Sequence, residues 1–191
     1  MADTLTKLLS APAELVAPRL LGCHLVRKVD GQLLTGRIVE TEAYDQHDVA
    51  SHSYRGETPR TKVMFGPPGY LYVYFTYGMH YCCNVVTGGV GHGSAVLIRA
   101  LEPLQGQQLM SQHRHGLGGE QLTNGPAKLC QALQIDKQWN DHDLRVSPLR
   151  LVIQPPLAQT SIIQTTRVGI SRGQDVPWRF YIRGNRFVSK M

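Results

Sequence analysis

Alternating hydrophobic and polar positions in the first quarter of the chain predict a β-hairpin. Residues 24–29 (HLVRKV) and 32–44 (QLLTGRIVETEAY) are rich in aliphatic and β-branched side chains, and Asp30-Gly31 separates the two runs. An Asp-Gly pair in this position favours a two-residue hairpin turn, because both residues tolerate positive φ. We therefore expect two antiparallel strands here.

The second of these strands carries an unusual set of side chains. By the period-two rule, Ile38, Glu40, Glu42 and Tyr44 share one face of the strand. Two carboxylates and a phenol are poor material for a hydrophobic core, because buried polar groups need partners. The pattern indicates the floor of a pocket.

A second hairpin is predicted at residues 69–86 (GYLYVYFTYGMHYCCNVV). Its turn falls near residues 76–79, and Tyr70, Tyr72 and Tyr74 would line one face. Five of the chain's eight tyrosines lie in this run. Such a cluster is typical either of a core-forming hairpin or of a surface that stacks on a flat molecule.

Weaker patterns place the other elements along the chain. We expect a helix or two helical turns within residues 5–21 with Ser10 as N-cap, a long polar loop over residues 45–68, a helix over residues 102–115, a helix opening at Pro126 after Asn124-Gly125, and strands at RLVIQPP, RVGI and RFYIRG.

Length and composition fit one globular unit. The chain has 191 residues, of which 42% are hydrophobic and 18% charged, and no repeat or linker divides it. We predict a single domain over residues 1–191. Its fold class is α+β, with a curved, mostly antiparallel β-sheet, a protruding β-hairpin and peripheral helices.

The charge balance narrows the class of partner. Twenty Lys and Arg residues against fourteen Asp and Glu give a net charge of +6, which favours a polyanion such as nucleic acid. On charge alone, an inert basic surface remains an equal alternative. The N-terminal segment is interrupted by Pro12 and Pro18, and no stretch is long enough to cross a bilayer. We expect an intracellular protein with no membrane partner.

Cysteine and glycine spacing argue against a bound cofactor. Of the four cysteines only Cys82 and Cys83 are close, and no CxxC spacing occurs, so we expect free thiols and no metal. The glycine-rich segment 87–94 does not join a strand to a helix as a nucleotide-binding loop does. No cofactor is predicted.

Glu42 is the first candidate for chemistry. A carboxylate on a strand face acts either as a general base or as the partner of a buried cation, and Glu42 alone favours the structural role. Arg99, at the end of another predicted strand, could satisfy Glu42 and keep it ionised. A glutamate held ionised beside an arginine is suited to activating water.

Aromatic side chains supply the second set of candidates. Tyr77 falls at the tip of the predicted hairpin, where an exposed ring on a basic protein could act as a wedge between stacked bases. His52 alone would more often make local hydrogen bonds in its loop. Together with Tyr44 and Tyr74 it could sandwich a planar base.

Eight segments of the chain closely resemble the alkyladenine (3-methyladenine) DNA glycosylase family. They occur in family order from Leu20 to Ser189 and read GRIVETEAY, DVASH, TPRTKVMF, PGYLYVYFTYGMHYCCN, LIRALEP, NGPAKLCQAL, RVGI and RFYIRG. The resemblance implies a monofunctional DNA glycosylase for alkylated or deaminated purines such as 3-methyladenine, 7-methylguanine, hypoxanthine and ethenoadenine.

The resemblance also implies roles in the pocket. Glu42 matches the general base, while Arg99 and the Val168 carbonyl match groups that position the attacking water. The stacking residues of the family correspond to Tyr44, His52 and Tyr74, and the residue that disfavours the guanine amino group corresponds to Asn84.

DNA contacts are implied in the same way. Tyr77 matches the wedge, with Gly78 and Met79 beside it at the hairpin tip. Thr58, Arg60 and Lys128 lie in segments that face the DNA backbone in the family. The pattern is not matched at Thr61 and His80, which leaves substrate preference open.

The implied partner is double-stranded DNA containing damaged purines, bound by a monomer. The enzyme would act in the bacterial nucleoid or, in a eukaryote, in the nucleus. Two alternatives remain from the residues themselves. One is a non-catalytic nucleic-acid-binding module, which would not need Glu42 with Arg99, and the other is a hydrolase of free nucleosides, for which the +6 charge would be superfluous.

Overall fold

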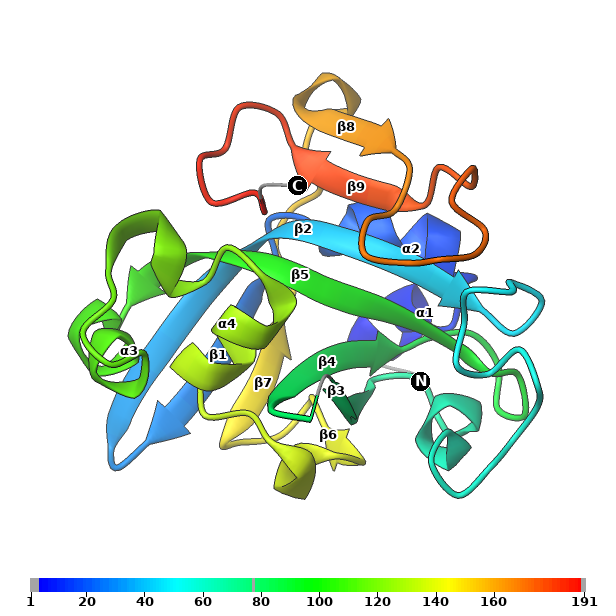
Figure 1. Ribbon diagram of the computed structural model, residues 1–191, viewed down its shortest axis with the longest axis horizontal. Coiled ribbons are helices and arrows are strands. Elements are labelled where there is room, and N and C mark those ends of the chain that lie inside the picture. Colours follow the sequence, from blue (N-terminus) through cyan, green and yellow to red (C-terminus); the bar gives the residue numbers. More distant parts are fainter. Residues whose placement is uncertain (1–3, 77, 190–191) are drawn as a thin grey trace.

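The computed structural model of the protein describes residues 4–76 and 78–189. Figure 1 shows a curled sheet with helices on both sides of it. The α-helices are α1 (Thr4–Leu9), α2 (Ala13–Leu20), α3 (Gln107–His113) and α4 (Pro126–Ala132). Short 3-10 turns are η1 (Lys62–Phe65), η2 (Gly119–Leu122), η3 (Lys137–Trp139) and η4 (Gln159–Ser161). The strands are β1 (His24–Val29), β2 (Gln32–Asp45), β3 (Tyr70–Thr76), β4 (His80–Val86), β5 (Ser94–Gln105), β6 (His142–Asp143), β7 (Leu149–Val152), β8 (Ile162–Thr165) and β9 (Arg179–Ile182).

Within the described residues, the strands form one sheet in which every pair is antiparallel. Its main path runs β6-β3-β4-β5-β2-β1-β7, and β9 pairs with β2 and β8. The predicted α+β class and antiparallel sheet are confirmed. Both predicted hairpins are present, and Asp30 and Gly31 have φ of 46° and 80°, as a two-residue hairpin turn requires.

The long strand β2 changes partner halfway along its length. Residues 32–37 pair with β1, whereas Glu40, Thr41 and Glu42 pair with β9 while β5 stays on the other side. Glu42 therefore lies on a strand that is flanked on both sides. Because both neighbouring strands shield this stretch, Glu40 and Glu42 have no solvent-exposed surface.

A bulge interrupts the β2–β5 ladder at the same point. The register shifts between Ile38 and Glu40 and again between Glu40 and Thr41. Ile38 packs in the main core, whereas Glu40 and Glu42 bond to Arg99. The predicted common face for Ile38 and the glutamates is wrong, since the bulge turns the glutamates to the other side of the sheet.

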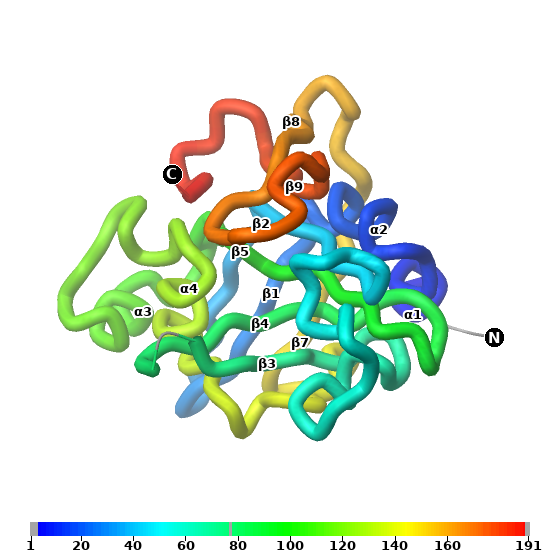
Figure 2. Tube along the Cα trace, turned by 45° about the vertical axis from the view of Figure 1, so that its right-hand side comes forward, coloured from blue at the N-terminus to red at the C-terminus, as the bar shows by residue number. Residues whose placement is uncertain are grey.

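The main core occupies the side of the sheet covered by α1 and α2. Val16, Ala17 and Leu20 of α2 pack with Ala43 of β2 and Ile98 of β5. Figures 1 and 2 show α1 and α2 together against this side of β2 and β5. Arg99 bonds to Glu40 and Glu42 on the opposite side of β2 and β5.

Three local predictions are wrong. The segment RVGI is not a strand: its residues 167–170 form a loop between β8 and β9. Strand β5 continues to Gln105, so the helix expected from residue 102 begins only at Gln107. Ser10 caps no helix start, because its hydroxyl donates backwards to the Thr6 carbonyl at 2.8 Å.

No helix in the described part of the chain is long and apolar enough to cross a membrane.

The loop predicted after β2 is present and contains only the short turn η1. In both views this loop lies beside the loop between β8 and β9 (Figures 1 and 2).

Candidate active site

A cavity of about 330 Å³ opens on the side of the sheet away from α1 and α2. This volume is at the small end of the range for sites that bury a ligand. Its walls come from β2, β3, β4, β5, the loop after β2, the loop before β9 and the start of α4. The lining residues are Tyr44, Ala50, Ser51, His52, Met64, Tyr72, Tyr74, Thr76, Cys82, Asn84, Leu97, Arg99, Pro126, Val168, Gly169 and Ile170.

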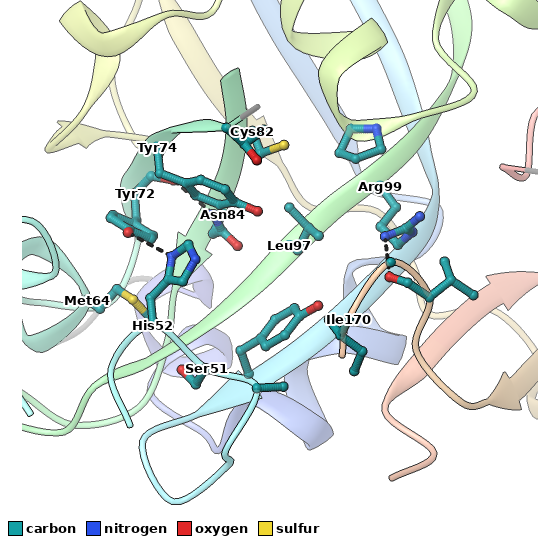
Figure 3. A pocket seen from close by; sticks show the side chains of 16 residues that line it. Ser51, His52, Met64, Tyr72, Tyr74, Cys82, Asn84, Leu97, Arg99 and Ile170 are labelled. Carbon is teal, nitrogen blue, oxygen red and sulfur yellow. Dashed lines mark hydrogen bonds between the residues drawn. The ribbon is translucent and has the colours of Figure 1, made fainter. Parts of the chain in front are cut away.

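Figure 3 shows how the cavity is divided. His52, Tyr72 and Tyr74 gather on one side, Arg99 lies on the other, and Leu97 lies between them. Of these residues, the sequence had placed His52, Tyr74 and Arg99 in one site. The structure brings them to one cavity.

Glu42 lies directly behind the Arg99 side of the cavity. Its Oε1 accepts a hydrogen bond from the Val168 amide at 2.9 Å, and its Oε2 accepts from the Tyr44 hydroxyl at 2.9 Å and from Arg99 Nη1 at 3.1 Å. All three partners are donors, as a carboxylate requires. A carboxylate offers about four lone-pair positions, so these three bonds leave one, while Glu42 itself is fully buried and does not line the cavity.

The neighbours of Glu42 are held in their donor forms. Burial, and then the charge of Glu42, raise the pKa of Tyr44, so its hydroxyl keeps its proton. For Arg99, burial would lower the pKa, but Glu42 and Glu40 outweigh it and the pKa is raised. Both groups therefore donate throughout the physiological pH range.

Arg99 is itself oriented from behind. Its Nε donates to Glu40 at 3.2 Å, while Nη1 also approaches the Val168 carbonyl at 3.4 Å. Glu40 accepts further bonds from Arg179 Nε at 2.7 Å and from the Ser189 amide at 2.7 Å. Glu40 does not line the cavity, and its contacts fix the guanidinium that does.

The opposite wall is aromatic. The His52 and Tyr74 rings lie 4.6 Å apart edge to face, and Tyr72 and Tyr74 stack with centroids 5.7 Å apart. His52 Nδ1 is 3.0 Å from the Tyr72 hydroxyl. Burial, and then the charge of Arg60, lower the pKa of His52 to about 4. His52 is therefore a neutral ring at physiological pH.

Asn84 lines the cavity from β4. Its side chain is buried, and its Nδ2 donates to the Tyr72 carbonyl at 3.1 Å across the β3–β4 pair. This bond fixes the orientation of the amide group.

The comparisons with known proteins show the family of this chain. Residues 7–186 match the family model described as methylpurine-DNA glycosylase (MPG). This chain belongs to the methylpurine-DNA glycosylase family. The family identifies it as an enzyme, a hydrolase of N-glycosidic bonds that acts on DNA, and this sets aside both alternatives drawn from the sequence.

Curated relatives support the assignment along most of the chain. Proteins provisionally named 3-methyladenine DNA glycosylase are 54% identical in Carboxydothermus hydrogenoformans, 51% in Methanoculleus marisnigri and 50% in Desulfitobacterium hafniense. Each alignment covers 92% of this chain, and 93%, 92% and 92% of the respective relatives.

The glycosylase cavity also contains residues that the sequence reasoning missed. Cys82 alternates with Asn84 on β4, and Leu97 alternates with Arg99 on β5, so the period-two rule could have found both. Pro126 and Ile170 come from a helix start and a loop, where no period exists. Only the fold could have revealed them.

The predicted DNA-facing residues that the structure describes do not line the cavity. Met79 is 69% exposed in the turn between β3 and β4, beside Gly78, whose φ is +68°. Tyr77, predicted as the wedge, lies outside the described residues. Lys128 Nζ donates to Asn124 Oδ1 at 2.7 Å.

Thr58 and Arg60 lie in the loop before η1. The hydroxyl groups of Thr58 and Thr61 are 2.9 Å apart, and Thr61 is buried in this turn. The Arg60 guanidinium lies 5.8 Å from the centroid of the Tyr74 ring. Among residues 4–76 and 78–189, no group of three or more potential metal ligands is placed to hold an ion.

Proposed function

We propose that this glycosylase flips a damaged purine into the cavity and hydrolyses its N-glycosidic bond with a water molecule activated by Glu42. The observation that carries the proposal is the buried Glu42 carboxylate, which accepts from the Val168 amide, Tyr44 and Arg99 behind a cavity walled by rings. A base within a duplex is out of reach, so the nucleotide must leave the stack.

The chemical step follows from this arrangement. Water attacks the anomeric carbon while Glu42 takes one of its protons, and the bond between C1′ and the base nitrogen breaks with its electrons going to the base. Arg99 and the Val168 carbonyl orient the water, and the Glu42 charge stabilises the cationic sugar of the transition state. Purines that carry a positive charge after alkylation leave readily as neutral bases.

The aromatic wall selects what enters. We assign Tyr44, His52 and Tyr74 to stacking on the flipped base, and Asn84 to discrimination against the guanine amino group. The substrates we expect are 3-methyladenine, 7-methylguanine, hypoxanthine and ethenoadenine. No lysine lines the cavity in the described part of the chain, so we expect base release without a covalent intermediate and without strand cleavage.

Tyr77 is proposed as the wedge that occupies the vacated position in the stack, with Gly78 and Met79 beside it and with Thr58, Arg60 and Lys128 contacting the backbone. Replacing Tyr77 with Ala should weaken binding to a lesion duplex more than binding to an unpaired lesion. Equal weakening of both would contradict the wedge assignment.

We expect the enzyme to act as a monomer on the genome, in a nucleoid or a nucleus.

The experiment that tests this function is a base-release assay over duplexes that each contain one of the four lesions. Chromatography of the products should show the free base and an intact strand with an abasic site. Borohydride should trap no enzyme–DNA adduct. Release of no base from any duplex, or a trapped adduct with strand cleavage, would contradict the proposal.

A further inference from the structure

Arg167 is a buried arginine just outside the cavity. Its side chain has no exposed surface, and its guanidinium forms an ion pair with both carboxylate oxygens of Asp48. Nη1 also donates to the Ala43 carbonyl at 3.0 Å, and Nη2 donates to the Gly173 carbonyl at 3.1 Å. One side chain therefore joins strand β2, the loop after β2 and the loop between β8 and β9.

The first connection concerns the proposed general base. Ala43 lies between Glu42 and Tyr44 on β2, and Arg167 directly precedes Val168. The Val168 amide can donate to Glu42 only while its loop stays against β2. The bond from Arg167 to the Ala43 carbonyl holds the loop there. It lies next to the 2.9 Å contact between Val168 and Glu42, because each of its residues neighbours one of theirs in sequence.

The second connection concerns the loop that carries His52. Asp48 Oδ1 accepts from the Ala50 amide at 3.1 Å, and the Asp48 carbonyl accepts from the Ser51 amide at 2.9 Å. These bonds shape the turn that leads into His52. Because the Asp48 carboxylate is also paired with Arg167, the position of this turn depends on the guanidinium.

The third connection is through the Tyr44 ring. The Arg167 guanidinium carbon lies 4.8 Å from the centroid of Tyr44 and 5.5 Å from that of Trp178. Trp178 is fixed to the same strand, since its carbonyl accepts from the Ala43 amide at 2.8 Å. Tyr44 lines the cavity and Arg167 does not, so the guanidinium supports the ring without contacting the cavity.

We propose that Arg167 is a positioning residue for base excision, which holds Glu42 with Val168, the Tyr44 ring and the His52 turn in one arrangement. The inference rests on the proposed function. Only a planar fork can donate to Asp48 and to two carbonyls while stacking on a ring, so lysine would not replace it.

The test compares Arg167→Lys and Asp48→Asn with a matched control, Arg114→Lys. Arg114 is also buried, and it donates to Gln131 and to the Gln121 carbonyl beside helices α3 and α4. Wild type and Glu42→Gln complete the set. For each protein we would measure the thermal midpoint, the affinity for a 3-methyladenine duplex, and the rate constant of base release with enzyme in excess at a temperature where all are folded.

We expect Arg167→Lys and Asp48→Asn to release base about 10- to 100-fold more slowly than wild type, as a displacement of roughly 1 Å in a reacting group can do. Duplex affinity should fall less than the rate does, because the phosphate contacts that these substitutions leave in place supply much of it. Arg114→Lys should keep the wild-type rate even if its midpoint falls as far. If Arg167→Lys does not fold, the rate of base release by Asp48→Asn tests the proposal.

Two results would overturn the inference. One is a wild-type rate in the variants at Arg167 and Asp48, and the other is an equal loss of rate in Arg114→Lys. If wild type itself releases no base, the proposed function fails and this inference falls with it. An active wild type with an inactive Glu42→Gln leaves only the role of Arg167 to be decided.

Discussion

The two walls of the cavity hold their side chains by different means. Behind the Arg99 wall, Glu40, Glu42 and Arg167 are buried, and each makes several ionic or backbone hydrogen bonds. On the aromatic wall, the rings of His52, Tyr72 and Tyr74 pack against one another, and His52 Nδ1 lies 3.0 Å from the Tyr72 hydroxyl.

The difference separates two tasks. Fixed donors and charges in a water-poor site stabilise a transition state because they need no reorganisation during the reaction. Ring faces tolerate many flat molecules, because every base has a π-face. We therefore expect changes on the Arg99 wall to slow the chemistry, and changes on the aromatic wall to weaken lesion binding.

Arg99→Lys should give the largest loss. A single ammonium cannot reach Glu40, Glu42 and the Val168 carbonyl together, so we expect base release to slow by about 100-fold or more at saturating enzyme. Arg37→Lys is the control, since Arg37 forms a half-exposed pair with Glu102 across the same two strands. A rate for Arg99→Lys within threefold of the Arg37→Lys rate would contradict a role of Arg99 in the chemical step.

Glu40→Gln should chiefly reduce stability. It leaves Arg179 and Arg99 buried with a neutral partner, and breaking such a buried pair costs about 3 kcal/mol. Urea unfolding measures this loss. Glu102→Gln, on the half-exposed pair, should cost less than about 1 kcal/mol, and equal losses in the two variants would contradict the Glu40 account.

Tyr74→Leu should weaken binding instead of slowing release. Loss of a base–aromatic contact costs about 1–3 kcal/mol, so affinity for a lesion duplex should fall while affinity for undamaged DNA stays the same. Tyr70→Leu is the control, because Tyr70 lies on the same strand but does not line the cavity. Titration with fluorescent duplexes measures both affinities. Equal affinities of Tyr74→Leu and Tyr70→Leu for the lesion duplex would contradict a stacking role for Tyr74.

Besides its stacking role, His52 should make folding stability depend on pH. Its folded-state pKa of about 4 lies below the unfolded value of 6.5. The unfolded chain therefore takes up a proton first as pH falls, and stability should decrease from pH 6.5 towards pH 4. His52→Asn should lack this part of the decrease, and an NMR titration of His52 with a midpoint near 6.5 would contradict it.

Local sequence patterns predicted the hairpins but not the geometry of the site. Alternation and Asp30-Gly31 were sufficient for β1 and β2, because strand pairing there is local. The bulge beside Glu40 lies in the pairing of β2 with β5, whose residues come about 60 positions later. RVGI has the composition of a strand, yet it forms a loop, and its Val168 amide bonds to the Glu42 side chain.

The catalytic candidates were predicted with unequal support. The pairing of Glu42 with a buried arginine followed from the cost of burying a carboxylate, and the Arg99 contact at 3.1 Å confirms it. The place of Val168 came only from the family resemblance, since nothing in a Val-Gly-Ile sequence marks a carbonyl. Arg167 was missed, because its partner Asp48 lies in an irregular loop.

The central claim is that Glu42 performs the chemistry and contributes little to binding. It is tested most directly by Glu42→Gln, with lesion-duplex affinity and single-turnover base release measured on the same 3-methyladenine duplex. We predict affinity within about threefold of wild type and release slowed by at least about 100-fold, the lower limit of a general-base contribution. Undiminished release by Glu42→Gln would contradict the account.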